Sequence, residues 1–315
     1  MYPHSRFWVV SSIVMDVVTR INQWPERSGD VVAQSGFATP GGAFNVIAAA
    51  RRLGMDTIYG GLMGTGAFGH MIQQHLRRIH VDWALRPVRD ADTGFVVAVV
   101  EPDGERTFIT VPGCEAHLTL ANLSALPVYP DDVVYISGYS LVAEPSASAF
   151  ARWMTSRQQN VVVLDPGPLI AEIAPEFLTS LIPHVDILTL NRREAHLISG
   201  HTHPADALMS IKQRFRVGNR SRILVRSGAD GTWISDANGA PQRIPSRAAR
   251  VVDTTGAGDV HTGALVTRMR HVPFPRAVFE ANVAASIAVE RLGPSESPTA
   301  LELAQCLQEI DQKEC

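Results

Sequence analysis

Short apolar runs alternate with longer amphipathic segments along most of the chain, and this alternation constrains the fold more than any other feature. The apolar runs suit strands that are buried on both faces, and the amphipathic segments suit crossover helices. The predicted strands are 7–15, 57–63, 132–137, 161–165, 185–190 and 222–226, and the predicted helices are 43–53, 68–79, 146–158, 257–270 and 275–291. We therefore expect a three-layer α/β/α fold with a mostly parallel central sheet.

The pattern changes between Thr93 and Val111, where the β-rich runs 94–100 and 106–111 are joined by Glu101-Pro-Asp-Gly-Glu105. An Asp-Gly turn favours a hairpin over a βα unit. With another strand predicted at 30–37, the hairpin would form a small second sheet from segments near 16–38 and 84–112. No repeat or linker interrupts the chain, so we expect one domain over residues 1–315.

Composition argues against several classes of partner. The chain has 315 residues, a net charge of −3 and no basic stripe, so a nucleic-acid partner is not expected. Its three cysteines lack CxxC spacing, which argues against a disulfide framework and favours a reducing cytoplasm. No apolar run approaches the ~18 residues of a membrane span, so no membrane contact is expected. The segment 7–15 is short and broken by two serines, which favours a strand over a signal peptide.

The segment Asp253-Thr-Thr-Gly-Ala-Gly-Asp259 indicates phosphoryl transfer. The small side chains of Gly256, Ala257 and Gly258 let backbone N–H groups approach an anion. The helix that follows adds the positive end of its dipole, and Asp259 could deprotonate an attacking hydroxyl. An ordinary strand-to-helix turn with a capping Asp explains the glycines, but it explains the two flanking acids less well.

This segment resembles the second signature of the ribokinase-like, or PfkB, carbohydrate kinase family. Gly41-Gly42-Ala43-Phe44-Asn45 resembles the family's earlier glycine-pair signature, and the similarity extends over nearly the whole chain. The resemblance implies Asp259 as the catalytic base and the amides of residues 256–258 as an anion hole. It also implies a ribokinase-like fold whose small sheet is a lid over the substrate and a dimer surface.

Four residues are expected on the acceptor side. Asp16 ends the first predicted strand, where open α/β sheets bind ligands, and its carboxylate can accept hydroxyl protons. The pair Gly41 and Gly42 permits close backbone approach, and Asn45 offers a donor and acceptors. In the family, the matching residues hold the acceptor sugar. Many members of that family have Gly in the first strand where this chain has Ser11 or Ser12.

The nucleotide side is expected after two later strands. The resemblance implies ATP and Mg²⁺ as cofactors, with Asn191 and Glu194 organising Mg²⁺-bound water, although the pair also fits a helix cap. The glycines of 226–231 would allow backbone contact with the nucleotide, but a hairpin turn explains them almost as well. The residues expected to bind the nucleotide are Asn191, Glu194, Arg226, Gly228, Gly231 and Asn282.

Many relatives bind K⁺ beside the anion hole, mostly through backbone carbonyls. The matching positions are Asp253, Thr255, Ala288, Arg291, Gly293 and Ser297. No GxxxxGK[ST] sequence occurs in the chain, which disfavours a P-loop kinase.

Two other patterns suggest different chemistry. Gly64-Thr-Gly-Ala-Phe-Gly69 spells the GxGxxG of dinucleotide-binding folds, which usually follows the first strand. Here a strand, the glycine pair and a helix already precede it, so we disfavour a dehydrogenase. His196, His201 and His203 lie close in sequence, but no carboxylate completes a zinc-ligand pattern.

We therefore expect an ATP-dependent sugar kinase that phosphorylates a hydroxyl, a primary one by preference. A nucleoside kinase with the same fold is the main alternative, with an apolar clamp for the base from 95–100 or Phe108. A ligand-binding regulator on this fold is a further alternative. The expected oligomer is a homodimer through the lid.

Overall fold

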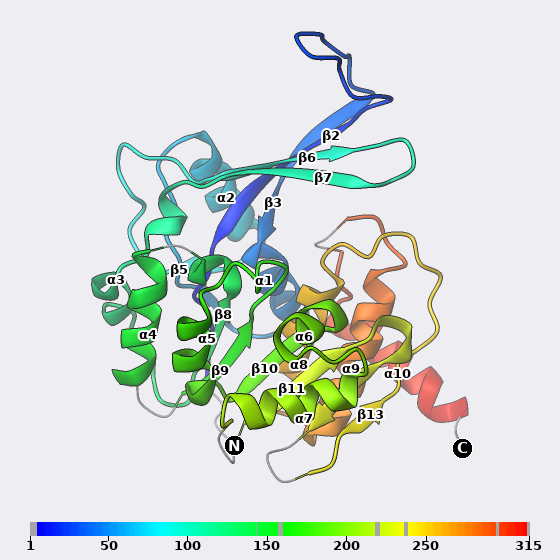
Figure 1. Cartoon of the computed structure of the whole chain (residues 1–315). Coiled ribbons are helices and arrows are strands. Elements are labelled where there is room, and N and C mark those ends of the chain that lie inside the picture. Colours follow the sequence, from blue (N-terminus) through cyan, green and yellow to red (C-terminus); the bar gives the residue numbers. More distant parts are fainter. Residues whose placement is uncertain are drawn as a thin grey trace.

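A nine-stranded sheet runs through the centre of the protein, in the order β13-β12-β11-β10-β9-β8-β1-β4-β5 (Figure 1). The computed structural model describes residues 5–142, 144–156, 160–217, 221–235, 239–293 and 296–313. The parallel strands are β1 (Phe7–Val9), β4 (Thr57–Tyr59), β5 (Asp82–Trp83), β8 (Val133–Ser137), β9 (Val161–Asp165), β10 (Ile187–Asn191) and β11 (Arg222–Arg226). The antiparallel strands β12 (Thr232–Ser235) and β13 (Gln242–Ile244) complete one edge.

Alternate residues of the central strands enter two separate hydrophobic cores. In β1, Phe7 and Val9 belong to one core, whereas Trp8 belongs to the other. All three side chains are buried, as expected for a parallel strand that is covered on both faces. The two cores confirm the predicted three-layer arrangement.

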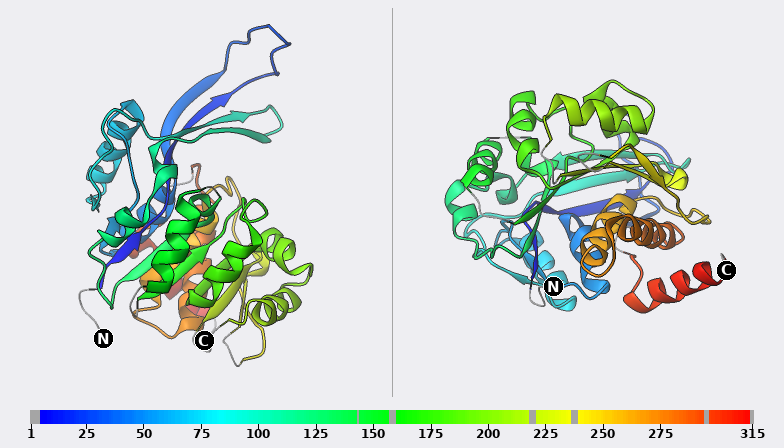
Figure 2. Two further views of the ribbon diagram at one scale, coloured as in Figure 1. Left: turned by 60° about the vertical axis from the view of Figure 1, so that its left-hand side comes forward. Right: turned by 90° about the horizontal axis from the view of Figure 1, so that it is seen from below.

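Helices cover both faces of the large sheet (Figure 2). One core contains residues of α1 (Ala43–Arg52), α2 (Ala67–Arg78), α8 (Ala257–Arg268), α9 (Phe274–Ala288) and α10 (Ala300–Lys313). The other contains residues of α3 (Leu120–Ser124), α4 (Ser146–Ser156), α5 (Pro175–Leu181), α6 (Arg192–Ser199) and α7 (Pro204–Arg214). None of the described helices is long and apolar enough to span a membrane.

The prediction of a single strand over residues 7–15 is wrong. The large sheet keeps only β1, and a second strand, β2 (Ile13–Arg20), belongs to a different sheet. The chain changes sheets at Ser11 and Ser12, whose hydroxyls contact those of Ser137 and Ser140 instead of continuing a ladder. Asp16 therefore lies inside a strand of the small sheet and not at the end of a strand of the large one.

The small sheet has the order β3-β2-β6-β7 and stands above the large sheet in Figure 1. The predicted hairpin is confirmed, because β6 (Phe95–Val100) and β7 (Arg106–Val111) pair antiparallel. Strand β3 (Ser35–Gly42) begins later than the predicted 30–37 and leads directly into α1. Since β2 pairs with both β3 and β6, it brings Asp16 opposite Thr39, two residues before the glycine pair.

Candidate active site

Three polar side chains lie at the carboxyl ends of neighbouring parallel strands. Asp165 ends β9, Asn191 ends β10 and Arg226 ends β11, and the last two are register partners. Such edges are where open α/β sheets bind ligands. The sequence predicted Asn191 and Arg226 at this edge, but it missed Asp165, which the position of its strand end could have indicated.

The glycine turn lies at the start of α8, beside this edge. Gly256 is the N-cap with φ 75°, a left-handed conformation that favours glycine. The first N–H groups of a helix have no intrahelical acceptor and point toward bound anions. The Ala257 N–H already donates to the Thr254 carbonyl at 3.2 Å, so an anion would share this amide with that carbonyl.

Asp259 lies in the first turn of α8 and faces α1. Its Oδ2 accepts a hydrogen bond from Asn45 Nδ2 at 3.1 Å, which joins the two predicted motifs. The two helices approach closely because Gly263 of α8 has no side chain. A Cβ at this position would lie only 2.8 Å from Ala49 Cβ of α1. Burial raises the pKa of Asp259 to about 7, and the charge of Asp165 acts in the same direction.

The Asp16 carboxylate lies directly against the backbone of Gly41. A Cβ on Gly41 would lie 2.1 Å from Asp16 Oδ2, so only glycine leaves room for the carboxylate. Burial raises the pKa of Asp16 to about 6. Within the described part of the chain, the buried Asn45 Oδ1 has no hydrogen-bond partner. An acceptor hydroxyl could donate to this oxygen.

A cavity of about 340 Å³ lies on the other side of the same turn. Ala257 and Gly258 line it, together with residues from β10, β11 and α9. The predicted nucleotide-side residues that line it are Asn191, Arg226, Gly228, Gly231 and Asn282. The amide of Asn282 is already used inside the protein, because its Nδ2 donates to the carbonyls of Ile244 (3.2 Å) and Pro245 (2.9 Å).

Asn191 and Glu194 form a capping box at the start of α6. The Asn191 side chain accepts from the Glu194 N–H at 2.8 Å, and Glu194 Oε2 accepts from the Asn191 N–H at 2.7 Å. Burial, with the charge of Asp165, raises the pKa of Glu194 to about 7. Each carboxylate oxygen retains a lone pair, so the pair fits a water-bridged Mg²⁺ without loss of the cap.

The residues predicted around K⁺ are partly assembled. Gly293 N–H donates to Asp253 Oδ2 at 3.3 Å, and Asp253 Oδ1 accepts from the Thr255 hydroxyl at 2.7 Å. Among the described residues, the buried hydroxyl of Ser297 has no hydrogen-bond partner, so its oxygen could serve as a cation ligand. Arg106 of β7 already pairs with Asp253 at 3.2 Å. Ala288 and Arg291 lie at the end of α9 and just after it, where the Arg291 N–H donates to the Ala288 carbonyl at 3.0 Å.

Sequence reasoning also missed Tyr139, which follows β8. Burial, together with the nearby charges of Asp259 and Asp16, raises the pKa of its hydroxyl to about 12. The tyrosine therefore stays protonated and can donate a hydrogen bond to a ligand. An isolated Gly-Tyr-Ser gives no signal of this role in the sequence.

The GxGxxG segment is the start of α2 and is already capped from within the protein. Asp92 accepts hydrogen bonds from the N–H groups of Phe68 (3.0 Å) and Gly69 (2.8 Å). A Cβ on Gly66 would lie 2.5 Å from Asp92 Oδ2. These amides are therefore unavailable to a pyrophosphate, which supports rejection of the dehydrogenase reading.

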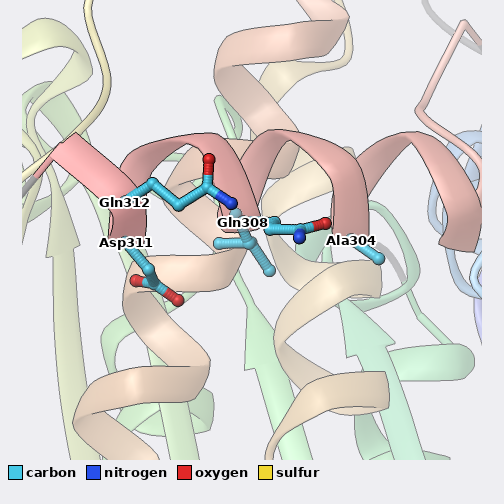
Figure 3. Close-up of a pocket in the computed structure, with 5 residues that line it drawn as sticks. Ala304, Gln308, Asp311 and Gln312 are labelled. Carbon is cyan, nitrogen blue, oxygen red and sulfur yellow. The ribbon is translucent and has the colours of Figure 1, made fainter.

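The histidine cluster and a hollow on α10 lie apart from this site. Over the described ranges, no three His, Cys, Asp or Glu side chains gather into a metal-binding group, so the histidines of 196–203 form none there. A second hollow lies along α10, lined by Ala304, Leu307, Gln308, Asp311 and Gln312 (Figure 3). Its one charged side chain, Asp311, is paired with Arg276 at 3.0 Å.

The sequence matches the family model described as pfkB family carbohydrate kinase over residues 6–300. The chain belongs to the PfkB family. An uncharacterized sugar kinase of Escherichia coli K12, YegV, is 30% identical over 94% of this chain and 92% of its own length. A mouse ribokinase is 28% identical over 92% of this chain and 90% of its own length.

Solved structures confirm the ribokinase fold for this PfkB protein. A ribokinase from Thermotoga maritima matches with a TM-score of 0.81 at 20% identity, covering 97% of this chain and 100% of its own. An Arabidopsis thaliana ribokinase complexed with ribose and ATP has a TM-score of 0.78 at 23% identity, with 96% and 99% covered. An adenosine kinase from Sinorhizobium meliloti also has a TM-score of 0.78, at 19% identity, with 97% and 99% covered.

Proposed function

We propose that the protein transfers the γ-phosphate of ATP to a primary hydroxyl of a small sugar, as one catalytic domain over residues 1–315. One observation supports this function most directly. Ala257 and Gly258 line the 340 Å³ cavity, whereas the next residue, Asp259, bonds to Asn45 at 3.1 Å. A single helical turn thus separates a nucleotide-sized cavity from a candidate base, as transfer between two ligands requires.

On the acceptor side, Asp16 and Asn45 would hold hydroxyls of the sugar, and the glycine pair 41–42 would let the ring lie against the backbone. Asp259 would remove the proton from the attacking hydroxyl. Its pKa near 7 suits a general base at neutral pH. Orientation of the hydroxyl by Asn45 would fix the direction of attack.

On the nucleotide side, the amides of Gly256, Ala257 and Gly258 would face the charge that develops on the transferred phosphoryl group. Asn191 and Glu194 would hold Mg²⁺ through water, and this ion supplies charge neutralisation on the phosphates when bound. Asn191, Arg226, Gly228, Gly231 and Asn282 would line the nucleotide. K⁺, if used, would lie among Asp253, Thr255, Ala288, Arg291, Gly293 and Ser297 and brace the turn.

A nucleoside is the second candidate acceptor, because an apolar strand of the small sheet lies beside Asp16. Val96 of β6 is the register partner of Asp16, so the two side chains project from the same face of the sheet. An apolar side chain at this position could pack against a base. The similar adenosine kinase fold supports the same alternative.

We also propose that two copies associate through their lids. The outer strand β7 is exposed along its whole length, and Phe108 (60%), Ile109 (54%) and Val111 (41%) present apolar surface there. A second copy would cover this strand and its unpaired edge. We expect a dimer in analytical ultracentrifugation that Phe108→Glu converts to monomer; a monomeric wild type would contradict the lid dimer.

A cytoplasmic location is proposed with this function, since the cytoplasm supplies ATP and keeps thiols reduced. Among the described residues, the buried Cys114 is a free cysteine.

The decisive experiment measures acceptor-dependent ADP release from Mg-ATP across pentoses, hexoses, sugar phosphates and nucleosides. We expect turnover with a free sugar, and we expect Asp259→Asn to lower kcat by about 10²- to 10⁴-fold because the proton has no acceptor. Asp311→Asn on α10 is the matched control. We expect this variant to keep the kcat of the wild type, because Asp311 does not belong to the site.

Each outcome of this experiment has one meaning. Activity with nucleosides alone would replace the sugar by a nucleoside. Absence of acceptor-dependent turnover, together with ATP binding, would favour a regulator. Full activity of a folded Asp259→Asn variant would remove Asp259 from the role of base.

A further inference from the structure

Arg226 borders the 340 Å³ cavity, but its guanidinium group is bonded to acceptors inside the protein. It ends β11 and is only 12% exposed. Its Nη1 lies 2.8 Å from Asp165 Oδ2, 3.1 Å from the Gly258 carbonyl and 3.2 Å from the Thr262 hydroxyl. These internal acceptors take up the hydrogen-bonding capacity of this nitrogen.

The bond to Gly258 connects Arg226 to the first turn of α8. Gly258 belongs to the proposed anion hole, and a Cβ on it would lie 3.1 Å from Arg226 Nη1. Thr262 adds a second connection, because its hydroxyl donates to the same Gly258 carbonyl at 3.0 Å. Arg226 therefore packs against the turn from within the protein and fixes the peptide that joins Gly258 to Asp259.

Asp165 in turn fixes Arg226. It lies two strands away, at the end of β9, and is 6% exposed. Its Oδ1 accepts from the Gly167 N–H at 3.1 Å, so the carboxylate itself is held in place. Glu194 lies 3.7 Å from Arg226 Nη2 and contributes a second negative charge. A guanidinium between two carboxylates is neutralised, which weakens its attraction for phosphate.

We propose that Asp165 and Arg226 form a positioning pair that holds the Gly256–Asp259 turn in the geometry needed for phosphoryl transfer. The inference rests on the proposed kinase function and adds to it two residues with an indirect role. Neither side chain needs to touch substrate. If Arg226 lost Asp165, it could turn toward the cavity, and the turn would lose its support.

The competing role for Arg226 is direct binding of an ATP phosphate. The two roles differ in the kinetic constant that they control. A phosphate ligand used equally in the ground and transition states affects the KM for ATP, whereas a support for the anion hole and base affects kcat. They also differ in their dependence on Asp165, because only a positioning pair requires both partners.

The test compares Asp165→Asn, Arg226→Met, the double variant and Arg226→Lys in the ATP-dependent assay with saturating acceptor. Asp132→Asn is the matched control. Asp132 is also buried and paired with an arginine, Arg6 at 3.0 Å, but it precedes β8 and so lies at the opposite end of the sheet. Thermal unfolding of every variant separates loss of stability from loss of positioning.

We expect kcat to fall roughly 10- to 100-fold in Asp165→Asn and Arg226→Met, with the KM for ATP changed by less than about threefold. The double variant should be no slower than Arg226→Met, because the two residues act as one unit. Arg226→Lys should recover part of kcat, because it restores the charge. Asp132→Asn should lower Tm and leave kcat unchanged.

Two results would contradict the proposed positioning role of Asp165 and Arg226. One is a rise in the KM for ATP with unchanged kcat in Arg226→Met, which would make Arg226 a phosphate ligand. The other is unchanged kcat in a folded Asp165→Asn, with only Tm lowered. Wild-type turnover is measured first, so an inactive wild type counts against the kinase function and not against the pair.

Discussion

At the scale of single residues, the site concentrates acids whose charged forms are disfavoured. Burial raises the pKa of Asp16 to about 6 and the pKa values of Glu194 and Asp259 to about 7. Elsewhere, acids bonded to arginines or backbone amides keep low pKa values, as Asp132 and Asp253 do. Raised values of this kind are typical of functional sites, where burial serves the chemistry at the expense of stability.

The pH dependence of turnover should follow Asp259. Because the base must be ionised and its pKa is raised to about 7, kcat should rise with pH through about 7 and level off above it. The pH–rate profile of the wild type measures this limb. A flat profile between pH 5 and 8 would contradict the assignment.

The same residue should affect stability in the opposite direction. A carboxyl whose folded-state pKa lies above its unfolded value stabilises the fold while protonated and loses that contribution as pH rises toward the folded pKa. Asp259→Asn cannot ionise, so its Tm relative to wild type should be higher at pH 8 than at pH 5. A Tm difference that is independent of pH would show that the carboxyl is not perturbed.

Gly41 should be irreplaceable for acceptor binding. In Gly41→Ala, the new Cβ would occupy the place of the Asp16 carboxylate, so the KM for the acceptor should rise about tenfold or more while the KM for ATP stays unchanged. Gly36→Ala is the control on the same strand, where a Cβ meets only ordinary contacts of 3.4 Å or more. Equal effects of the two variants on acceptor KM would refute the role of Gly41.

At the scale of elements, the sequence predicted β9 and β11 with their observed bounds, since each has a short apolar run that ends at a charged residue. The prediction of strands was wrong where the partner of a strand could not be inferred from its local sequence pattern. Residues 7–15 are apolar except for Ser11 and Ser12, and the chain passes from one sheet to the other at these two serines. Which sheet an apolar strand joins depends on partners far along the chain, and these cannot be read from local periodicity.

The lid hairpin is tied to the anion-hole segment by Arg106, which pairs with Asp253 and bonds to the Thr255 hydroxyl. Loss of this contact should let the hairpin open more often and admit water, so Arg106→Met should raise ATP hydrolysis relative to sugar phosphorylation by a few-fold. Arg20→Met, on β2 of the same lid, is the control. An unchanged ratio of hydrolysis to transfer would show that the contact does not govern closure.

At the scale of the whole molecule, the two sequence motifs predicted that distant segments would meet, and the bond between Asn45 and Asp259 brings them together. The proposed pairing of Asp165 with Arg226 was not predictable in the same way. Arg226 was expected to bind the nucleotide, and only the strand order places Asp165 within 2.8 Å of it. The sequence could indicate that both residues lie at strand ends, but it could not indicate that they contact each other.

The bond between Asn45 and Asp259 also has a consequence for biosynthesis, because it joins residues 214 positions apart. A ribosome releases the lid and α1 long before it makes α8, and contacts of such separation form late since a long loop must close first. During refolding, helical structure should therefore return before activity does. Until the last third of the chain emerges, the apolar face of α1 that will contact α8 is open to chaperones or to other chains.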